Sequence, residues 1–103
     1  MTRELEALDS LPRTLHLFAE GRVQGVGYRE FARRAALRHA LSGWVRNRAD
    51  GSVEARVSGA AHDLEAFAEA LRVGPAGAAV RGLRVVEDGE PPELSGFVIA
   101  PSR

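Results

Sequence analysis

The alternation of apolar and polar residues along the chain predicts several β-strands. From Thr14 to Glu20, leucine or alanine stands at every second position, with polar or aromatic residues between them. This is the period of a β-strand with one buried face. Residues 52–58 repeat it, with valine and alanine alternating against glutamate and arginine. Gly82 predicts a weak point or a bulge in a later strand. Three further runs complete the predicted strands: 44–48, 80–87 and 97–100.

Two segments have the period of an amphipathic helix instead. From Tyr28 to about Ala40, alanines group with Tyr28 and His39 on one side, while glutamate and arginines group on the other. Leu37 falls among the polar residues, so we expect it to be partly exposed. A glycine in the segment 42–43 is expected to end this helix. Residues 62–72 form the second predicted helix, which the Gly-Pro pair that follows it stops.

The predicted order of elements is β-α-β-β-α-β with a short extra C-terminal strand. This order is typical of an α+β, ferredoxin-like sandwich, in which two helices cover one face of an antiparallel sheet. Asp50-Gly51 predicts a hairpin between the second and third strands. Residues 1–13 are mostly polar and predict a flexible N-terminal lead-in, and 14–103 then form a single domain. The fold hosts many functions, so the function has to come from a site.

Composition removes several kinds of chemistry. The chain has no cysteine and no lysine, which excludes a thiolate nucleophile, a disulfide framework and a Schiff-base lysine. Its 14 basic and 14 acidic residues balance, which argues against a general nucleic-acid binder. The histidines are scattered and the acidic residues are not clustered, so we expect no metal site and no cofactor. No apolar run reaches membrane-spanning length, and a cytoplasmic monomer without nucleic-acid or membrane partners is the expectation.

A glycine-rich stretch between the first strand and the first helix is the strongest candidate site. Residues 21–27 contain three glycines, which permit the positive φ angles that let successive N–H groups converge on an anion. The N-terminus of the following helix adds further free N–H groups. Arg29, in the first helical turn, can reach back to clamp a phosphate. A tight connection without any ligand explains the spacing equally well. The predicted phosphate-binding loop comprises Arg22, Val23, Gln24, Gly25, Val26, Gly27 and Tyr28.

Two motifs together resemble the signature of the acylphosphatase family. Residues 21–29 read Gly-Arg-Val-Gln-Gly-Val-Gly-Tyr-Arg, and residues 43–47 read Gly-Trp-Val-Arg-Asn. The resemblance runs from about Thr14 to the C-terminus. It implies an enzyme that hydrolyses acyl phosphates to a carboxylate and inorganic phosphate. It also implies that Arg29 is the catalytic arginine that holds the phosphate and that Asn47 is the catalytic asparagine that orients the attacking water.

The chain departs from the family pattern at two positions. Arg48 follows Asn47 where the family commonly has threonine, and His39 stands where the family usually has an aliphatic residue. Asparagine is disfavoured in strands, so Asn47 alone is also compatible with a residue that shapes the hairpin turn. Two other functions stay open. A non-catalytic module that binds an anion or a peptide needs the loop but not Asn47. RNA binding by an RRM-like sheet needs aromatic residues on the central strands, and 52–58 has none.

Overall fold

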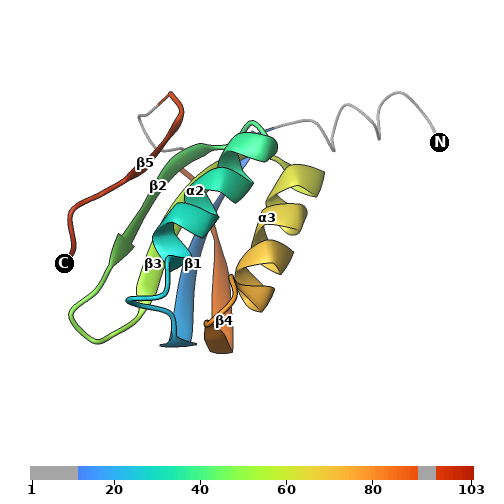
Figure 1. Cartoon of the computed structure of the whole chain (residues 1–103). Helices are drawn as coiled ribbons and strands as arrows, with labels where there is room; N and C mark the ends of the chain where they lie inside the picture. Colours follow the sequence, from blue (N-terminus) through green and yellow to red (C-terminus); the bar gives the residue numbers. More distant parts are fainter. Residues whose placement is uncertain (1–11, 91–94) are drawn as a thin grey trace.

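The computed structural model describes residues 12–90 and 95–103, so residues 1–11 of the predicted lead-in lie outside the described residues. Pro12 and Arg13, which were also assigned to the lead-in, belong to the first strand. Figure 1 shows the chain as one sheet with two helices on the same side. The elements in chain order are β1 Pro12–Arg22, α2 Tyr28–Arg38, β2 Ser42–Asn47, β3 Val53–Ala60, α3 Ala61–Val73, β4 Ala79–Asp88 and β5 Phe97–Ile99.

The five strands form one sheet in the order β4-β1-β3-β2-β5. The pairs β1–β3, β1–β4 and β2–β3 are antiparallel, as predicted. β5 runs parallel to β2, with Phe97 opposite Gly43, so the extra C-terminal strand, whose direction was not predicted, makes the sheet mixed. Alternation along a strand indicates that the strand exists, but it carries no information about which neighbour the strand pairs with or in which direction.

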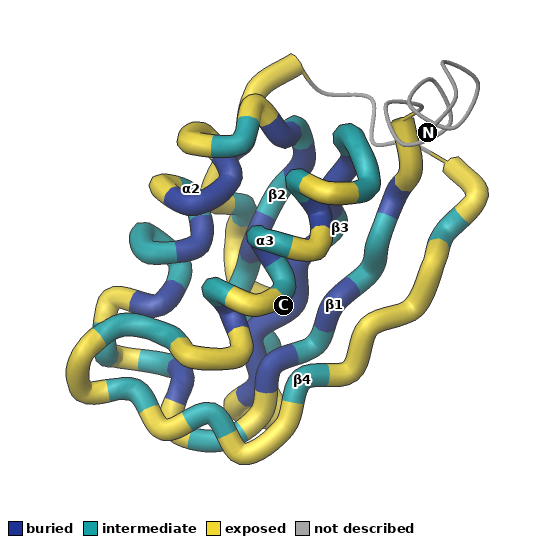
Figure 2. Tube along the Cα trace, turned by 90° about the vertical axis from the view of Figure 1, so that its right-hand side faces the viewer, coloured by how far each residue is buried: buried dark blue, intermediate teal, exposed yellow. Residues whose placement is uncertain are grey.

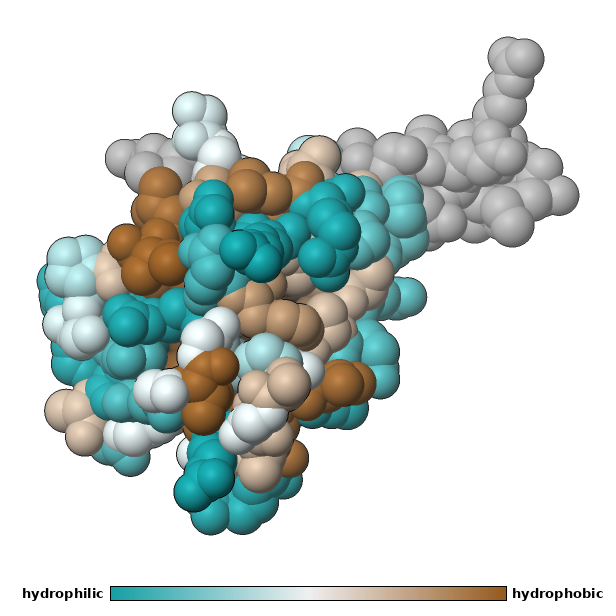
Figure 3. Space-filling view, in the orientation of Figure 1, coloured by the Kyte–Doolittle hydropathy of each residue, from teal (hydrophilic) through white to brown (hydrophobic). Residues whose placement is uncertain are grey.

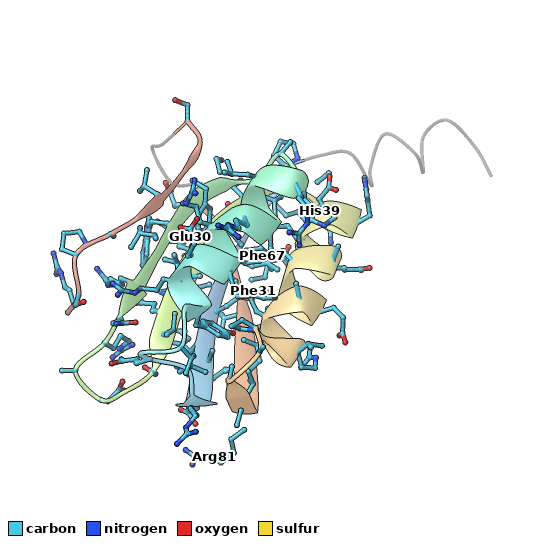
Figure 4. The ribbon with its side chains drawn as sticks, viewed as in Figure 1. Glu30, Phe31, His39, Phe67 and Arg81 are labelled. Atoms are coloured by element: carbon cyan, nitrogen blue, oxygen red, sulfur yellow. The ribbon has the colours of Figure 1, made fainter. Side chains whose placement is uncertain are left out.

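The hydrophobic core lies between one face of the sheet and the two helices. Figure 2 shows buried segments in the inner strands and on the sides of α2 and α3 that face them, while β4 is largely exposed. The apolar residues of the central strands face the core: Leu17, Ala19, Val53, Ala55 and Val57 are buried, and Leu15 is half-buried. Glu54, which alternation placed on the other face of β3, is also buried. Phe67 of α3 extends into the space between helices and sheet (Figure 4) and is fully buried.

The outer faces of the helices are solvent faces. In Figure 3 hydrophilic residues cover much of the side that carries α2 and α3, and the hydrophobic residues lie in separate groups. Leu37 is half exposed, as its place among polar residues predicted. Among the described residues, no helix is both long enough and apolar enough to cross a membrane.

The first helix ends earlier than predicted. α2 stops at Arg38, and Ser42-Gly43 already belongs to β2, so a glycine does not end this helix. The chain turns instead at Ala40, which takes a positive φ of 53°, and the N–H of Leu41 donates to the carbonyl of Ala36 at 2.9 Å. A left-handed residue after a helix is ordinarily glycine. For this reason the end of the helix was predicted at Gly43, the nearest glycine.

A bulge lies at the end of β1, where the chain leaves the sheet for the glycine-rich loop. Glu20 pairs with Gly82 but Gly21 pairs with Val80, so Arg81 is the extra residue on β4, next to the glycine that predicted an irregularity. Figure 4 shows Arg81 pointing away from the sheet. Gly21 has a φ of 118°, and a Cβ there would lie 2.2 Å from the carbonyl oxygen of Ala79. Only glycine fits this close approach, which directs the chain into the loop.

Candidate active site

The glycine-rich loop leads directly into the N-terminus of α2. Gly25 and Gly27 both have left-handed φ angles, 76° and 79°, as the predicted anion cradle requires. Gly27 is the N-cap residue, and no side chain caps the helix there. The first helical hydrogen bond runs from the N–H of Phe31 to the carbonyl of Gly27, at 3.0 Å. The N–H groups of residues 28–30 therefore have no partner within the helix, and a bound anion would satisfy them.

A cleft of about 220 Å³ opens beside this helix N-terminus. It brings together the two motifs that the sequence separates, because Arg29 comes from the first turn of α2 and Asn47 from the end of β2. The edge strand β5 closes the cleft with Ile99. The lining residues are Val23, Gly25, Gly27, Tyr28, Arg29, Glu30, Asn47 and Ile99.

Asn47 carries an unusual polar atom. Its side-chain oxygen Oδ1 is buried and accepts no hydrogen bond from any described residue. Buried polar atoms are ordinarily paired, and an unpaired one calls for a specific explanation, such as a ligand or a water. The backbone of Asn47 is fixed on both sides, since it pairs with Val53 of β3 and its carbonyl accepts the N–H of Arg103 at 2.9 Å. The backbone of Asn47 is thus held at a defined place beside the cleft.

Glu30, the acidic residue that lines the cleft, forms ion pairs with two arginines of the same helix. Nη2 of Arg33 lies 2.6 Å from Oε1 of Glu30, and Nε of Arg34 lies 3.2 Å from the same oxygen. The hydrogen bond from Arg33, followed by that from Arg34, lowers the pKa of Glu30 to about 2. Figure 4 shows Glu30 on α2. Arg33 and Arg34 pair with this carboxylate and do not line the cleft, so Arg29 is the arginine among the lining residues that can meet an anion.

Gln24 has a role that the sequence did not reveal. Its side-chain Nε2 donates to the carbonyl oxygens of Arg48 at 2.8 Å and Ser52 at 2.9 Å. These two residues begin and end the turn between β2 and β3, so Gln24 fastens the glycine-rich loop to the hairpin that carries Asn47. A long amide in a loop of small residues is the only signal of this contact in the sequence.

Three residues of the predicted phosphate-binding loop do not line the cleft. Arg22 is the last residue of β1 and is exposed, Gln24 turns toward the hairpin, and Val26 packs against the core. Tyr28 lines the cleft, but its phenol is buried elsewhere: the hydroxyl donates to the carbonyl of Leu71 in α3 at 2.7 Å. Burial raises the pKa of this phenol. These side chains shape the loop, and its backbone faces the cleft.

The two departures from the family pattern lie outside the cleft lining. His39, which the helical period placed on the apolar side, is partly buried, and its Nδ1 lies 3.2 Å from Oδ1 of Asp63 in α3. The guanidinium of Arg48 lies 5.3 Å from the centre of the Phe18 ring. Neither residue touches the cleft, so neither changes the set of groups that a ligand would meet there.

Known proteins resemble this chain in sequence and in fold. A family model described as Acylphosphatase matches residues 15–99. The Acylphosphatase of Azorhizobium caulinodans is 46% identical over 90 residues, which are 87% of this chain and 97% of the relative. The crystal structure of acylphosphatase from Bacillus subtilis matches with a TM-score of 0.82 at 35% identity, covering 85% of this chain and 98% of that one. An acylphosphatase from Coxiella burnetii matches with a TM-score of 0.83 at 31% identity over 97% and 100% of the two chains. The fold class predicted from the sequence is confirmed, and the chain belongs to the acylphosphatase family.

Proposed function

We propose that this protein hydrolyses the carboxyl–phosphate bond of small acyl phosphates. The observation that carries the proposal is the buried, unpaired Oδ1 of Asn47 in the same cleft as Arg29 and the glycine-rich loop. An anion-binding module would need the loop and the arginine but would have no use for a free acceptor opposite them. A reaction that brings a water to a bound phosphate needs all three.

The phosphate group of the substrate binds at the N-terminus of α2. The N–H groups of residues 28–30 and the loop backbone donate to its oxygens, and the positive end of the helix dipole favours its charge. Arg29 donates to two phosphate oxygens at once, as a guanidinium does. These groups are in place before the reaction, so they stabilise the charge that develops on the transferring group without reorganisation.

Asn47 positions the nucleophile. Its Oδ1 accepts a hydrogen bond from a water, which directs a lone pair of that water at the phosphorus, in line with the departing carboxylate. The P–O bond to water forms, the bond to the carboxylate oxygen breaks, and the carboxylate leaves with the bonding electron pair. A carboxylate is a good leaving group and needs no strong general acid. The proton of the water passes to an oxygen of the phosphate itself.

Glu30 is a poor alternative proton acceptor. It is the one carboxylic acid among the residues that line the cleft, but its pKa of about 2 makes it a weak base at neutral pH. We therefore expect kcat to change little with pH around neutrality. A pH–rate profile controlled by an enzyme group that titrates near pH 7 would contradict this route for the proton.

The test is hydrolysis of benzoyl phosphate by the purified protein with EDTA present. Arg29→Ala and Asn47→Ala should each lower kcat by roughly 10²-fold or more, the scale of losing one preorganised donor or orienting group. Arg29→Ala should also weaken inhibition by inorganic phosphate. Arg38→Ala, which removes an exposed arginine from the other end of α2, is the matched control and should leave both properties unchanged.

Two results would contradict the proposal in different ways. Near-normal turnover in Asn47→Ala would remove the role given to that residue. A folded wild-type protein that binds phosphate but hydrolyses no acyl phosphate would favour the non-catalytic anion-binding module. A cytoplasmic location and a monomeric state stay predictions, which cell fractionation and size-exclusion chromatography can check.

A further inference from the structure

A second cleft lies on the opposite face of the sheet from the helices. Along β2, Val45 is buried under the helices and Asn47 lines the catalytic cleft, so the alternate residues Trp44 and Arg46 project from the open face. Here β2, β5 and the segment after β5 enclose a cleft of about 310 Å³, at the sheet edge remote from β4 (Figure 1). Its lining residues are Trp44, Arg46, Val98, Ala100, Pro101 and Arg103. It shares no lining residue with the catalytic cleft.

The walls of this open-face cleft combine flat apolar surface with positive charge. The indole of Trp44, the side chain of Val98, which is 44% exposed, and the ring of Pro101 supply the apolar part. The guanidinium of Arg46 lies 4.5 Å from the centre of the Trp44 ring, which is cation–π geometry. The second cation is Arg103, and none of the lining residues is acidic. A ligand complementary to these walls has a flat aromatic part and a negative charge.

The groups of the cleft are held in place before any ligand arrives. Nε of Arg46 donates to Oε1 of Glu54 at 2.7 Å, and Oε2 of Glu54 lies 2.6 Å from Nε2 of His16. Burial by itself raises the pKa of Glu54, but its hydrogen bonds to Arg46 and His16 outweigh burial, so the pKa is below its ordinary value. This ionised carboxylate orients Arg46 through one nitrogen and leaves the rest of the guanidinium, beside Trp44, able to donate.

The segment after β5, which forms the outer wall of the open-face cleft, is hydrogen-bonded to β2 through its backbone. The N–H of Ala100 donates to the carbonyl of Val45 at 2.8 Å, and the N–H of Arg103 donates to the carbonyl of Asn47 at 2.9 Å. A further bond, at 2.6 Å, joins the N–H of Ala49 to the carbonyl of Arg103. Because the backbone of this wall is already fixed, less conformational entropy is lost when a ligand binds.

We propose that the open-face cleft binds a mononucleotide. The base stacks on the Trp44–Arg46 pair between Val98 and Pro101, and the phosphate contacts the guanidinium of Arg103. Stacking on an aromatic ring tolerates any base, so we expect little selectivity among bases. The volume of the cleft lies at the lower end of the range of small-molecule sites, roughly 300–1,000 Å³, which suits one nucleotide. The proposal does not depend on the hydrolytic activity, because the two clefts lie on opposite faces.

Trp44 gives a direct measurement, because it is the only tryptophan of the chain. The full-length protein is titrated with AMP, with Trp44 emission recorded under excitation beyond the absorption of adenine and heats measured by calorimetry. The titration is run first without inorganic phosphate and then with saturating inorganic phosphate, which occupies the cleft beside α2. The expected result is a saturable change of Trp44 emission. Adenosine, which lacks the phosphate, and ribose 5-phosphate, which lacks the base, should each bind roughly tenfold or more weakly, the scale of one charged hydrogen bond or one stacking contact.

Variants separate this site from general attraction to arginine. Arg103→Ala should weaken AMP binding roughly tenfold, the scale of one charge-assisted hydrogen bond. Arg38→Ala removes the same charge from the helix side and should leave binding unchanged. Trp44→Phe, followed by calorimetry, should retain measurable binding, whereas Trp44→Leu should abolish it. If Trp44→Leu destabilises the sheet, Arg103→Ala, at an exposed position outside every strand, still decides the question.

Four outcomes would overturn the proposal. The first is the absence of any saturable signal with AMP. The second is equal binding of ribose 5-phosphate and AMP, which would mean that only the charge is recognised. The third is loss of AMP binding when inorganic phosphate is added, which would place AMP in the catalytic cleft. The fourth is an oligonucleotide that binds far more tightly than AMP, which would make the ligand a nucleic-acid chain and not a free nucleotide.

Discussion

The contact between Gln24 and the hairpin allows one prediction to be developed in detail. Gln24→Met keeps the length of the side chain but removes both of its hydrogen bonds to the carbonyls of Arg48 and Ser52. Neither carbonyl becomes unpaired, because the N–H of Gly51 still donates to Arg48 at 3.1 Å and the N–H of Arg48 still donates to Ser52 at 2.9 Å. The loss is therefore the net value of two hydrogen bonds, about 1–3 kcal/mol in total, without an added penalty for a buried orphan group.

The effect on catalysis should exceed the effect on stability. Gln24 joins the glycine-rich loop to the hairpin that carries Asn47, and it does not line the cleft, so we expect it to act as a positioning residue. A misplacement of about 1 Å between reacting groups can cost roughly 10²-fold in rate. We expect kcat for benzoyl phosphate to fall about tenfold or more in Gln24→Met. The inhibition constant of inorganic phosphate should change less, because the loop backbone and Arg29 remain.

Tyr28→Phe is the control for destabilisation alone. It removes the buried hydrogen bond to the carbonyl of Leu71 at 2.7 Å, which should cost about 1–3 kcal/mol, and it leaves the link between loop and hairpin intact. Both variants are measured by urea unfolding and by steady-state kinetics at a temperature where each is folded. The reasoning fails if Gln24→Met unfolds more easily but keeps kcat within twofold of the wild type, or if Tyr28→Phe loses kcat to the same degree.

Three further predictions concern glycine packing, acid stability and phosphate binding. Gly43→Ala would place a Cβ 1.9 Å from a carbonyl oxygen of β3 at a φ of 142°, so urea unfolding should show a loss of about 3 kcal/mol or more. Gly82→Ala, with open space around the new Cβ, should stay within about 0.5 kcal/mol. The pKa of Glu54 is lowered in the folded protein, so the ionised carboxylate stabilises the fold fully above the ordinary pKa of 4.5. This stabilisation is lost as pH falls through the lowered pKa. Glu54→Gln should therefore flatten the dependence of Tm on pH in this acidic range, and an unchanged slope would contradict the assignment. Inorganic phosphate at a hundred times its Kd should stabilise the wild type by about 2.7 kcal/mol, seen as a rise of Tm that Arg29→Ala abolishes, whereas an equal rise in that variant would place the phosphate elsewhere.

The site was only partly predictable from the sequence. The two motifs identified Arg29 and Asn47, and the glycine spacing predicted the left-handed residues of the loop. The helical period placed Tyr28 on the apolar side of its helix, but the sequence did not indicate that its hydroxyl binds the carbonyl of Leu71 or that Gln24 holds the hairpin. Both side chains make contacts far along the chain, and local spacing carries no information about such contacts.

The sequence by itself determined the elements of this protein and the family to which it belongs. Period-2 and period-3.6 patterns are local properties, because each residue faces the core or the solvent according to the geometry of its own strand or helix. Only the tertiary structure decided which strands are neighbours, that β5 joins β2 in parallel, and that no described residue donates a hydrogen bond to Oδ1 of Asn47. It also decided that Trp44 and Arg103 share a cleft on the open face. These properties depend on the pairing of distant segments, which the balance of packing and hydrogen bonding over the whole sheet determines and no single segment encodes.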